Sequence, residues 1–78
     1  MAELRSDYVL DVRGEGCPFP LLKTKKQITT IEAGKVLEVV STDPMSVDNI
    51  QGWAKDHGHE IIKVLKGNGE IHIFIKKK

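Results

Sequence analysis

The residue best suited to covalent chemistry in this chain is its single cysteine, Cys17, because a thiolate is a strong nucleophile. Gly16 precedes it, and Pro18 and Pro20 follow it. Proline is favoured at the first position of a helix, since that position needs no N–H donor and the ring presets φ. With Cys17 as N-cap and Pro18 as the first helical residue, the run predicts a rigid helix start that presents the sulfur to solvent.

The dipole of such a helix activates the thiol only modestly. A helix N-terminus stabilises a nearby anion by about 0.3–1 kcal/mol. One pKa unit corresponds to about 1.4 kcal/mol, so the thiol pKa falls from roughly 8.5 to about 8. No base with a recognisable spacing accompanies Cys17. A thiol that is presented but weakly activated fits a carrier, whose partners supply the chemistry, better than a stand-alone enzyme.

A single cysteine also excludes several kinds of site. There is no Cys-x-x-Cys redox couple, and any disulfide would have to be intermolecular. A cysteine-ligated structural zinc site is excluded for the same reason. Of the histidines, His57 is interpreted as a helix-end residue and His59 as a loop residue. We therefore expect neither a metal site nor a bound cofactor.

Four short runs have the composition of β-strands. They span residues 8–12, 36–40, 60–66 and 70–76. The last two runs are separated by Gly67-Asn68-Gly69, which is the signal of a three-residue hairpin.

Two amphipathic helices are predicted between these runs. The first begins at Pro18 and is stopped by Gly34. In the second, Asp43 is expected as the N-cap and Pro44 as the first helical residue. Gly58 closes this second helix.

The resulting order, β-α-β-α-β-β, predicts an α+β fold. Alternation of strand and helix favours parallel neighbours joined by helical crossovers, and the last hairpin adds an antiparallel strand. We expect a two-layer α/β sandwich, in which a four-stranded mixed sheet carries both helices on one face. Ile71, Ile73 and Ile75 should face the helices, and His72 and Phe74 should lie on the opposite face.

Length and charge limit the function further. The 78 residues are expected to form one domain, residues 1–78. The net charge of +1, from 12 basic and 11 acidic residues, lacks the excess of a typical nucleic-acid binder. The first residues lack the apolar run of a signal peptide, and no stretch reaches membrane-spanning length. We expect a cytoplasmic protein without a membrane span.

Residues along nearly the whole chain match a known family. They are Leu10, Asp11, Gly14, Cys17, Pro18, Pro20, Gly34, Asp43, Pro44, Asp48 and Ile50. Together they resemble the TusA-like (SirA) sulfur carrier family, whose hallmark is Cys-Pro-x-Pro at the start of the first helix. The predicted order of strands and helices is also that of the family.

The resemblance implies that Cys17 accepts sulfane sulfur as a transient persulfide, which is more acidic than the thiol. The donor would be a cysteine desulfurase or a rhodanese-like protein. An acceptor protein would then take the sulfur, as in the thiolation of tRNA uridine, so any link to tRNA would be indirect. Gly16, Pro18 and Pro20 would support the turn that carries Cys17.

Four further residues are candidates for contact with a partner. Phe19, at the x position of the motif, either anchors a donor or packs on the first helical turn. Members of the family that act in tRNA thiolation carry an acidic residue there. Lys23 and Lys26 either steer a partner or belong to a solvated helix face. Asp43 is first a helix cap and second a contact near the thiol.

Two other functions compete with the carrier role. In the first, the chain is a small RNA-binding or regulatory module that uses its lysines and the open sheet face, and Cys17 is incidental. The missing basic excess and the missing aromatic platform argue against it. In the second, the chain is a redox protein that works through mixed disulfides. The missing resolving cysteine argues against that function.

Overall fold

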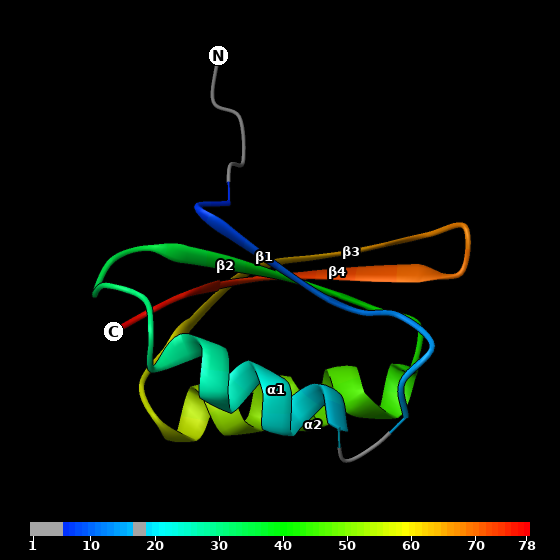
Figure 1. Cartoon of the computed structure of the whole chain (residues 1–78), viewed down its shortest axis with the longest axis horizontal. Helices are drawn as coiled ribbons and strands as arrows, with labels where there is room; N and C mark the ends of the chain where they lie inside the picture. Colours follow the sequence, from blue (N-terminus) through cyan, green and yellow to red (C-terminus); the bar gives the residue numbers. More distant parts are fainter. Residues whose placement is uncertain (1–5, 17–18) are drawn as a thin grey trace.

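Apolar, β-branched residues form the centre of the sheet in the computed structural model, which describes residues 6–16 and 19–78. The strands are β1 (Tyr8–Val12), β2 (Val36–Ser41), β3 (Glu60–Gly67) and β4 (Glu70–Lys76). Strands β1 and β2 are parallel, whereas β4 is antiparallel to both β2 and β3. The described residues thus form a mixed four-stranded sheet of order β1-β2-β4-β3 (Figure 1).

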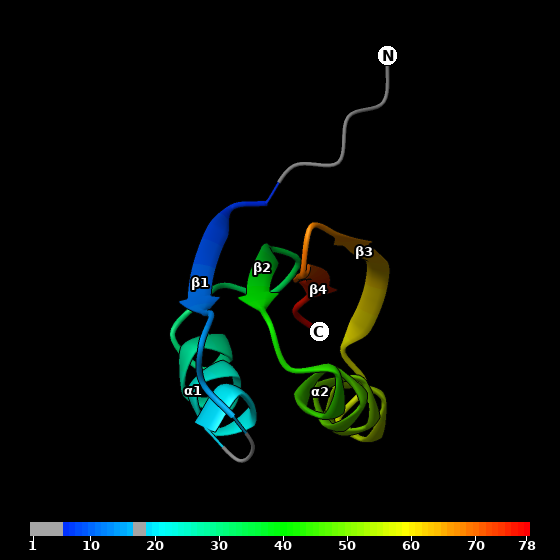
Figure 2. The same cartoon turned by 90° about the vertical axis from the view of Figure 1, so that its right-hand side faces the viewer.

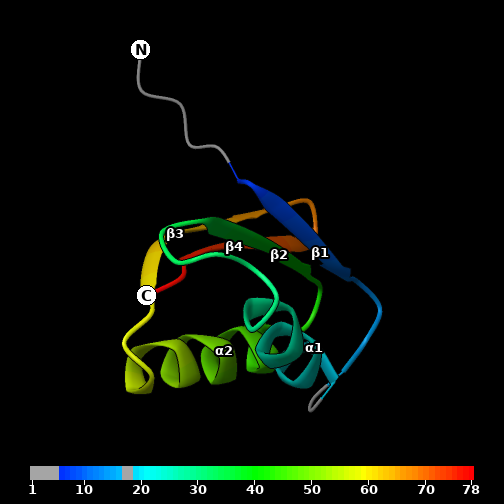
Figure 3. The ribbon, with the colours of Figure 1, turned by 60° about the vertical axis from the view of Figure 1, so that its left-hand side comes forward.

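Two helices cover one face of this sheet (Figure 2). Helix α1 (Phe19–Ile28) joins β1 to β2, and helix α2 (Pro44–Asp56) joins β2 to β3. Because β1 and β2 are parallel and each leads into a helix, both helices begin at the carboxyl end of the parallel pair (Figure 3). The predicted two-layer α+β arrangement is confirmed.

The hydrophobic core lies between the sheet and the two helices. Its fully or nearly buried members are Val12, Ile28, Ile31, Leu37, Val39, Val47, Ile50, Ala54, Ile71, Ile73 and Ile75. Burial of one Val, Leu or Ile side chain contributes about 1.5–3 kcal/mol to the free energy of unfolding. The three isoleucines of β4 face the helices, as their alternation in the sequence predicts.

The other face of β4 carries His72 and Phe74, as predicted, but Phe74 is not an exposed aromatic residue. Only 6% of Phe74 is exposed. Its place on a central strand sets it between Glu38 of β2 and Lys63 of β3. Long side chains such as these cover apolar surface with their methylene groups. Phe74 therefore offers no open aromatic contact surface.

Helix α1 ends before the predicted stop at Gly34. Its last residue is Ile28. The two threonines that follow donate their hydroxyl groups to carbonyl oxygens of the last turn, from Thr29 to Lys26 at 2.7 Å and from Thr30 to Gln27 at 2.7 Å. Such side-chain bonds to the backbone compete with continuation of a helix.

The hairpin between β3 and β4 is tighter than the sequence predicts. Gly67 pairs with Glu70, so only Asn68 and Gly69 form the loop. Both have positive φ, 52° for Asn68 and 78° for Gly69. This is the pattern of a two-residue type I′ turn, which fits the twist of the flanking strands.

Candidate functional site

The Cys-Pro-x-Pro motif follows β1 in the sequence, and its last two residues, Phe19 and Pro20, are the first two residues of α1. Cys17 and Pro18 lie outside the described residues, and so does their predicted role as N-cap and first helical residue. The residues on either side, from Arg13 to Gly16 and from Phe19 onward, are described. The geometry of the site is therefore built from these two flanks.

Backbone contacts fix the flank that follows β1. The Gly14 N–H donates to Thr42 Oγ1 at 2.9 Å, which ties this loop to the segment that leads into α2. The Glu15 N–H donates to the Val12 carbonyl at 3.2 Å. Gly14 has a φ of 78°, a conformation that glycine adopts without strain. The loop is thus held against both parallel strands.

Two contacts connect this loop to α1 across the motif. The Phe19 N–H donates to the Gly16 carbonyl at 3.1 Å. The Lys23 ammonium group lies 2.6 Å from the Glu15 carboxylate. Lys23, a candidate partner contact, therefore has a local role, although its side chain remains half exposed. Lys26 is exposed on the last turn of α1.

Pro20 anchors the first turn of α1 in the interior. It is fully buried, and its carbonyl oxygen accepts a 2.7 Å hydrogen bond from Thr24 Oγ1. Thr24 is itself fully buried. A buried proline restricts φ at the helix start.

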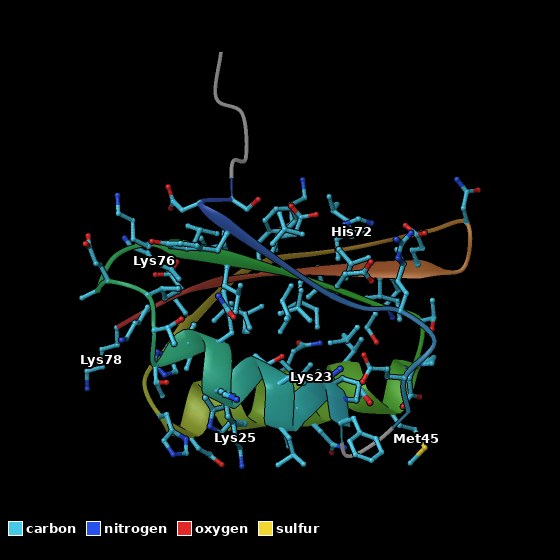
Figure 4. All side chains as sticks on the ribbon, in the orientation of Figure 1. Lys23, Lys25, Met45, His72, Lys76 and Lys78 are labelled. Carbon is cyan, nitrogen blue, oxygen red and sulfur yellow. The ribbon has the colours of Figure 1, made fainter. Side chains whose placement is uncertain are left out.

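Phe19 points away from this interior. It is 56% exposed, so it does not pack on the first helical turn. Two other large apolar residues at the starts of the helices are also exposed, Leu22 at 51% and Met45 at 70%. Figure 4 shows Met45 at the end of the molecule opposite Lys78. We call Phe19, Leu22 and Met45 the apolar rim.

Sequence reasoning missed Leu22 and Met45. They could have been found as apolar residues that lie outside the apolar stripe of each amphipathic helix. Leu22 lies outside the α1 stripe that contains Thr24 and Ile28, and Met45 stands in the first turn of α2 outside the stripe of Val47.

Asp43 is the N-cap of α2, as predicted. Its Oδ1 accepts from the Met45 N–H at 3.2 Å, and its Oδ2 accepts from Ser46 Oγ at 2.7 Å. Pro44 stands in the first turn. The cap places a carboxylate at the same end of the fold as the motif.

Charged side chains join the loop before the motif to the sheet. Arg13 donates to Asp11 at 2.8 Å and to Glu70 at 3.0 Å. The hydrogen bonds from Arg13 lower the pKa of Asp11 to about 2 and also lower the pKa of Glu70. The same bonds raise the pKa of Arg13. Sequence reasoning missed this cluster, because its members are far apart in the chain.

His72 extends the cluster on the face of the sheet away from the helices. Its Nδ1 lies 2.6 Å from Glu38 Oε2, and its Nε2 lies 3.4 Å from Glu70 Oε1. The hydrogen bond to Glu38 is the main cause that raises the pKa of His72.

The described residues hold no group of three or more His, Cys, Asp or Glu side chains arranged to bind a metal ion. His57 and His59 instead stack near Trp53, with ring centroids 5.6 and 5.2 Å from it. Burial is the main cause that lowers the pKa of His59. Among the described helices, none has the length and apolar character needed to cross a membrane.

Comparison with known proteins gives consistent matches. The family model described as "Sulfurtransferase TusA" matches residues 8–77. The "Sulfur carrier protein TusA" of Allochromatium vinosum is 39% identical over 71 residues, which are 91% of this chain and 93% of that protein. A longer relative from Aquifex aeolicus is 39% identical over 77 residues, 99% of this chain but 39% of that protein.

One solved structure has the same fold. It is the crystal structure of a SirA-like protein from Desulfitobacterium hafniense, with a TM-score of 0.79 and 32% sequence identity. The match covers 88% of this chain and 95% of that one.

Proposed function

Because this chain belongs to the TusA family of sulfur carriers, we propose that Cys17 receives sulfane sulfur as a persulfide and passes it to an acceptor. The observation that carries the proposal is the construction of the motif's two flanks. The loop before Cys17 and the helix after it are tied together by the Glu15–Lys23 ion pair and the Gly16–Phe19 hydrogen bond. These contacts restrict how far the two flanks can separate.

In the proposed first step, the Cys17 thiolate attacks the outer sulfur of a donor persulfide. A new S–S bond forms on Cys17, the donor's S–S bond breaks, and the donor leaves as a thiolate. No external oxidant or reductant is consumed, because one disulfide-type bond replaces another. In the second step an acceptor takes the outer sulfur and Cys17 is released as a thiolate. The positive end of the α1 dipole would stabilise the anionic forms.

The apolar rim supports a docking role for this end of the fold. Exposed aromatic and methionine side chains are enriched at protein interfaces, and Phe19 and Met45 are exposed on both helix starts. We include Asp43, at the start of α2, and Lys26, on the last turn of α1, as charged contacts for a partner, whereas Lys23 acts by holding the loop. The partners in this proposal are cytoplasmic: a cysteine desulfurase or rhodanese-like donor, and an acceptor protein such as one that thiolates tRNA.

The competing RNA-binding function gains no support from Lys23, since its ammonium group is already paired with Glu15. Phe74, which a stacking platform would have used, is only 6% exposed.

Intact mass after alkylation tests the carrier role directly. The chain is incubated with a persulfide-loaded desulfurase and then trapped with an alkylating reagent. Wild type should gain one sulfur atom, and Cys17→Ser should gain none. A wild-type chain that gains no sulfur, or a Cys17→Ser chain that does, contradicts the proposal. Salt-dependent RNA binding that survives Cys17→Ala would favour the competing function.

A further inference from the structure

His72 lies on the face of the sheet away from the helices (Figure 4). There it lies between two carboxylates. Its Nδ1 is 2.6 Å from Glu38 of β2, and its Nε2 is 3.4 Å from Glu70 of β4. The side chains are 32% exposed for His72, 18% for Glu38 and 35% for Glu70. Charge interactions at such partly buried positions are stronger than those in free solution.

This group of side chains leads directly to the loop before the motif. Glu70 Oε2 accepts a 3.0 Å hydrogen bond from Arg13, the first residue after β1. Arg13 also bonds to Asp11, and the next residue, Gly14, bonds to Thr42. Contacts therefore run without interruption from Glu38 through His72, Glu70 and Arg13 to the start of that loop.

We propose that His72 is a positioning residue for the loop before Cys17, residues 13–16. His72 holds this loop through Glu70 and Arg13 when both of its ring nitrogens carry protons. The biological purpose of this positioning role rests on the proposed carrier role of Cys17. The contacts on which it depends do not involve sulfur transfer.

The number of protons on His72 decides which contacts persist. An imidazolium ion has two N–H donors and serves both carboxylates, whereas a neutral imidazole has one donor and one lone pair. The shorter contact, to Glu38, keeps the remaining proton on Nδ1. The lone pair on Nε2 then faces the Glu70 carboxylate and repels it. Glu70 turns away, and Arg13 loses one of its two carboxylate partners.

The direction of the pH effect follows from this arrangement. The hydrogen bond to Glu38 raises the pKa of His72, so the doubly protonated ring persists above the ordinary histidine range. The connection to Arg13 is complete below the ordinary pKa of histidine. It is lost as the pH rises through the raised pKa of His72.

Charged groups on the neighbouring strands also lie near this site. Lys66 of β3 lines the same shallow hollow as Glu70 and His72, and Lys63 of β3 lies beside Phe74. Asp11 of β1 is held by Arg13. Lysine and carboxylate side chains ordinarily titrate far from neutral pH, unlike histidine. Histidine is therefore the residue type at this site whose ordinary pKa lies near neutrality.

Alkylation of Cys17 by iodoacetamide provides a test that needs no sulfur donor. Rate constants are measured across the neutral range for wild type, for His72→Gln and for the control His57→Gln. Gln retains an N–H donor but cannot titrate. His57 is exposed at the end of α2 and contacts the Trp53 carbonyl, so its change should not affect the rate.

At low pH, wild type should react about two- to fivefold faster than His72→Gln, a range typical of one partly exposed charge contact. The ratio should fall to about one as the pH rises through the His72 titration midpoint measured by NMR. The ratio of the wild-type rate to the His57→Gln rate should stay near one at every pH. A ratio that does not change with pH for His72→Gln overturns the proposal.

A second variant tests the route through Glu70. In a Glu70→Ala background, adding His72→Gln should leave the rate unchanged, because residue 70 then has no acceptor to link His72 to Arg13. A full effect of His72→Gln in that background would overturn the route. If the His72 variants do not fold, the wild-type protein provides the test. The NMR chemical shift of the Arg13 Nε–H should change with pH at the same midpoint as His72. An Arg13 resonance that does not follow the His72 titration contradicts the proposal.

The outcomes for the two proposals are separable. If wild type accepts no sulfur but the alkylation ratio follows His72, the positioning role stands and the carrier role fails. If sulfur is accepted and the ratio is flat, the carrier role stands and the positioning role fails.

Discussion

Glu15 and Lys23 form a 2.6 Å ion pair that joins the loop before the only cysteine to the helix after it. The two residues are eight apart in sequence, and Cys17 lies between them. Their side chains are 31% and 50% exposed, so the pair is only partly shielded from water. Its main effect is therefore to restrict the separation of the two flanks.

Removal of this ion pair should affect sulfur acceptance more than stability. Lys23→Met should lower the free energy of unfolding by no more than about 1 kcal/mol, since exposed ion pairs contribute about 0.2–1 kcal/mol. The rate of persulfide formation should fall severalfold, because the two flanks separate more easily. Intact-mass time courses with a persulfide-loaded donor measure that rate. The matched control is Lys25→Met, an exposed lysine on the last turn of the same helix. Equal losses in both variants would contradict a specific role for the pair.

The cap of α2 should be a major local contribution to stability. Asp43 accepts hydrogen bonds from the Met45 N–H and from the Ser46 hydroxyl. Asp43→Ala should cost about 1 kcal/mol, with a range of about 0.5–2 kcal/mol for such caps. In a chain of this size each kcal/mol lowers Tm by about 4–8 °C.

Thermal unfolding followed by circular dichroism measures this loss. Asp48→Ala is the control, since Asp48 is exposed inside the same helix and alanine is a better helix former. A Tm that is equal in the two variants would show that the cap contributes nothing.

Asp11 should titrate well below an ordinary aspartate. Hydrogen bonds from Arg13 lower its pKa to about 2. The interaction therefore favours the folded state above the ordinary aspartate pKa and is lost as the pH falls through the lowered value. In Arg13→Met the midpoint should return toward the ordinary range of about 3.9. NMR titration of the carboxyl carbons measures both midpoints, and an Asp11 midpoint that does not move in the variant would rule out Arg13 as the cause.

The order of strands and helices could be predicted from sequence because local signals agree with one another. Asp43 with Pro44 marks the start of α2, and the run from Tyr8 to Val12 is apolar enough to form β1. Each of these signals depends on residues only a few positions apart. Patterns of this kind specify secondary structure before any tertiary contact is considered.

The polar contacts around the motif could not be predicted in the same way. Arg13 and Glu70 are 57 positions apart, and Glu38 and His72 are 34 apart. Glu38 and His72 meet because β2 and β4 lie side by side in the centre of the sheet. Arg13 reaches Glu70 from the end of β1, on the other side of β2. Both pairs therefore depend on the register of β2 against β4, and a shift of one residue in that register would move each side chain of β4 to the other face.

The apolar rim should be dispensable for folding but required for contact with partners. Phe19 and Met45 are 56% and 70% exposed, so Phe19→Ser and Met45→Gln remove little buried surface. Both variants should unfold within about 0.5 kcal/mol of wild type, as surface substitutions usually do. Loss of two interface anchors should nevertheless reduce transfer from a protein donor about tenfold or more. Transfer from a small inorganic polysulfide, which needs no docking surface, should be unchanged.

A matched control for the rim is available on the opposite face of the fold. Val9→Thr changes an apolar side chain of β1 that is 63% exposed and lies away from the helices. It should alter neither transfer from the protein donor nor transfer from polysulfide. Comparing the two sulfur sources in each variant separates docking from thiol chemistry. If the rim variants lose transfer from both sources equally, the rim supports the motif itself and does not dock a partner.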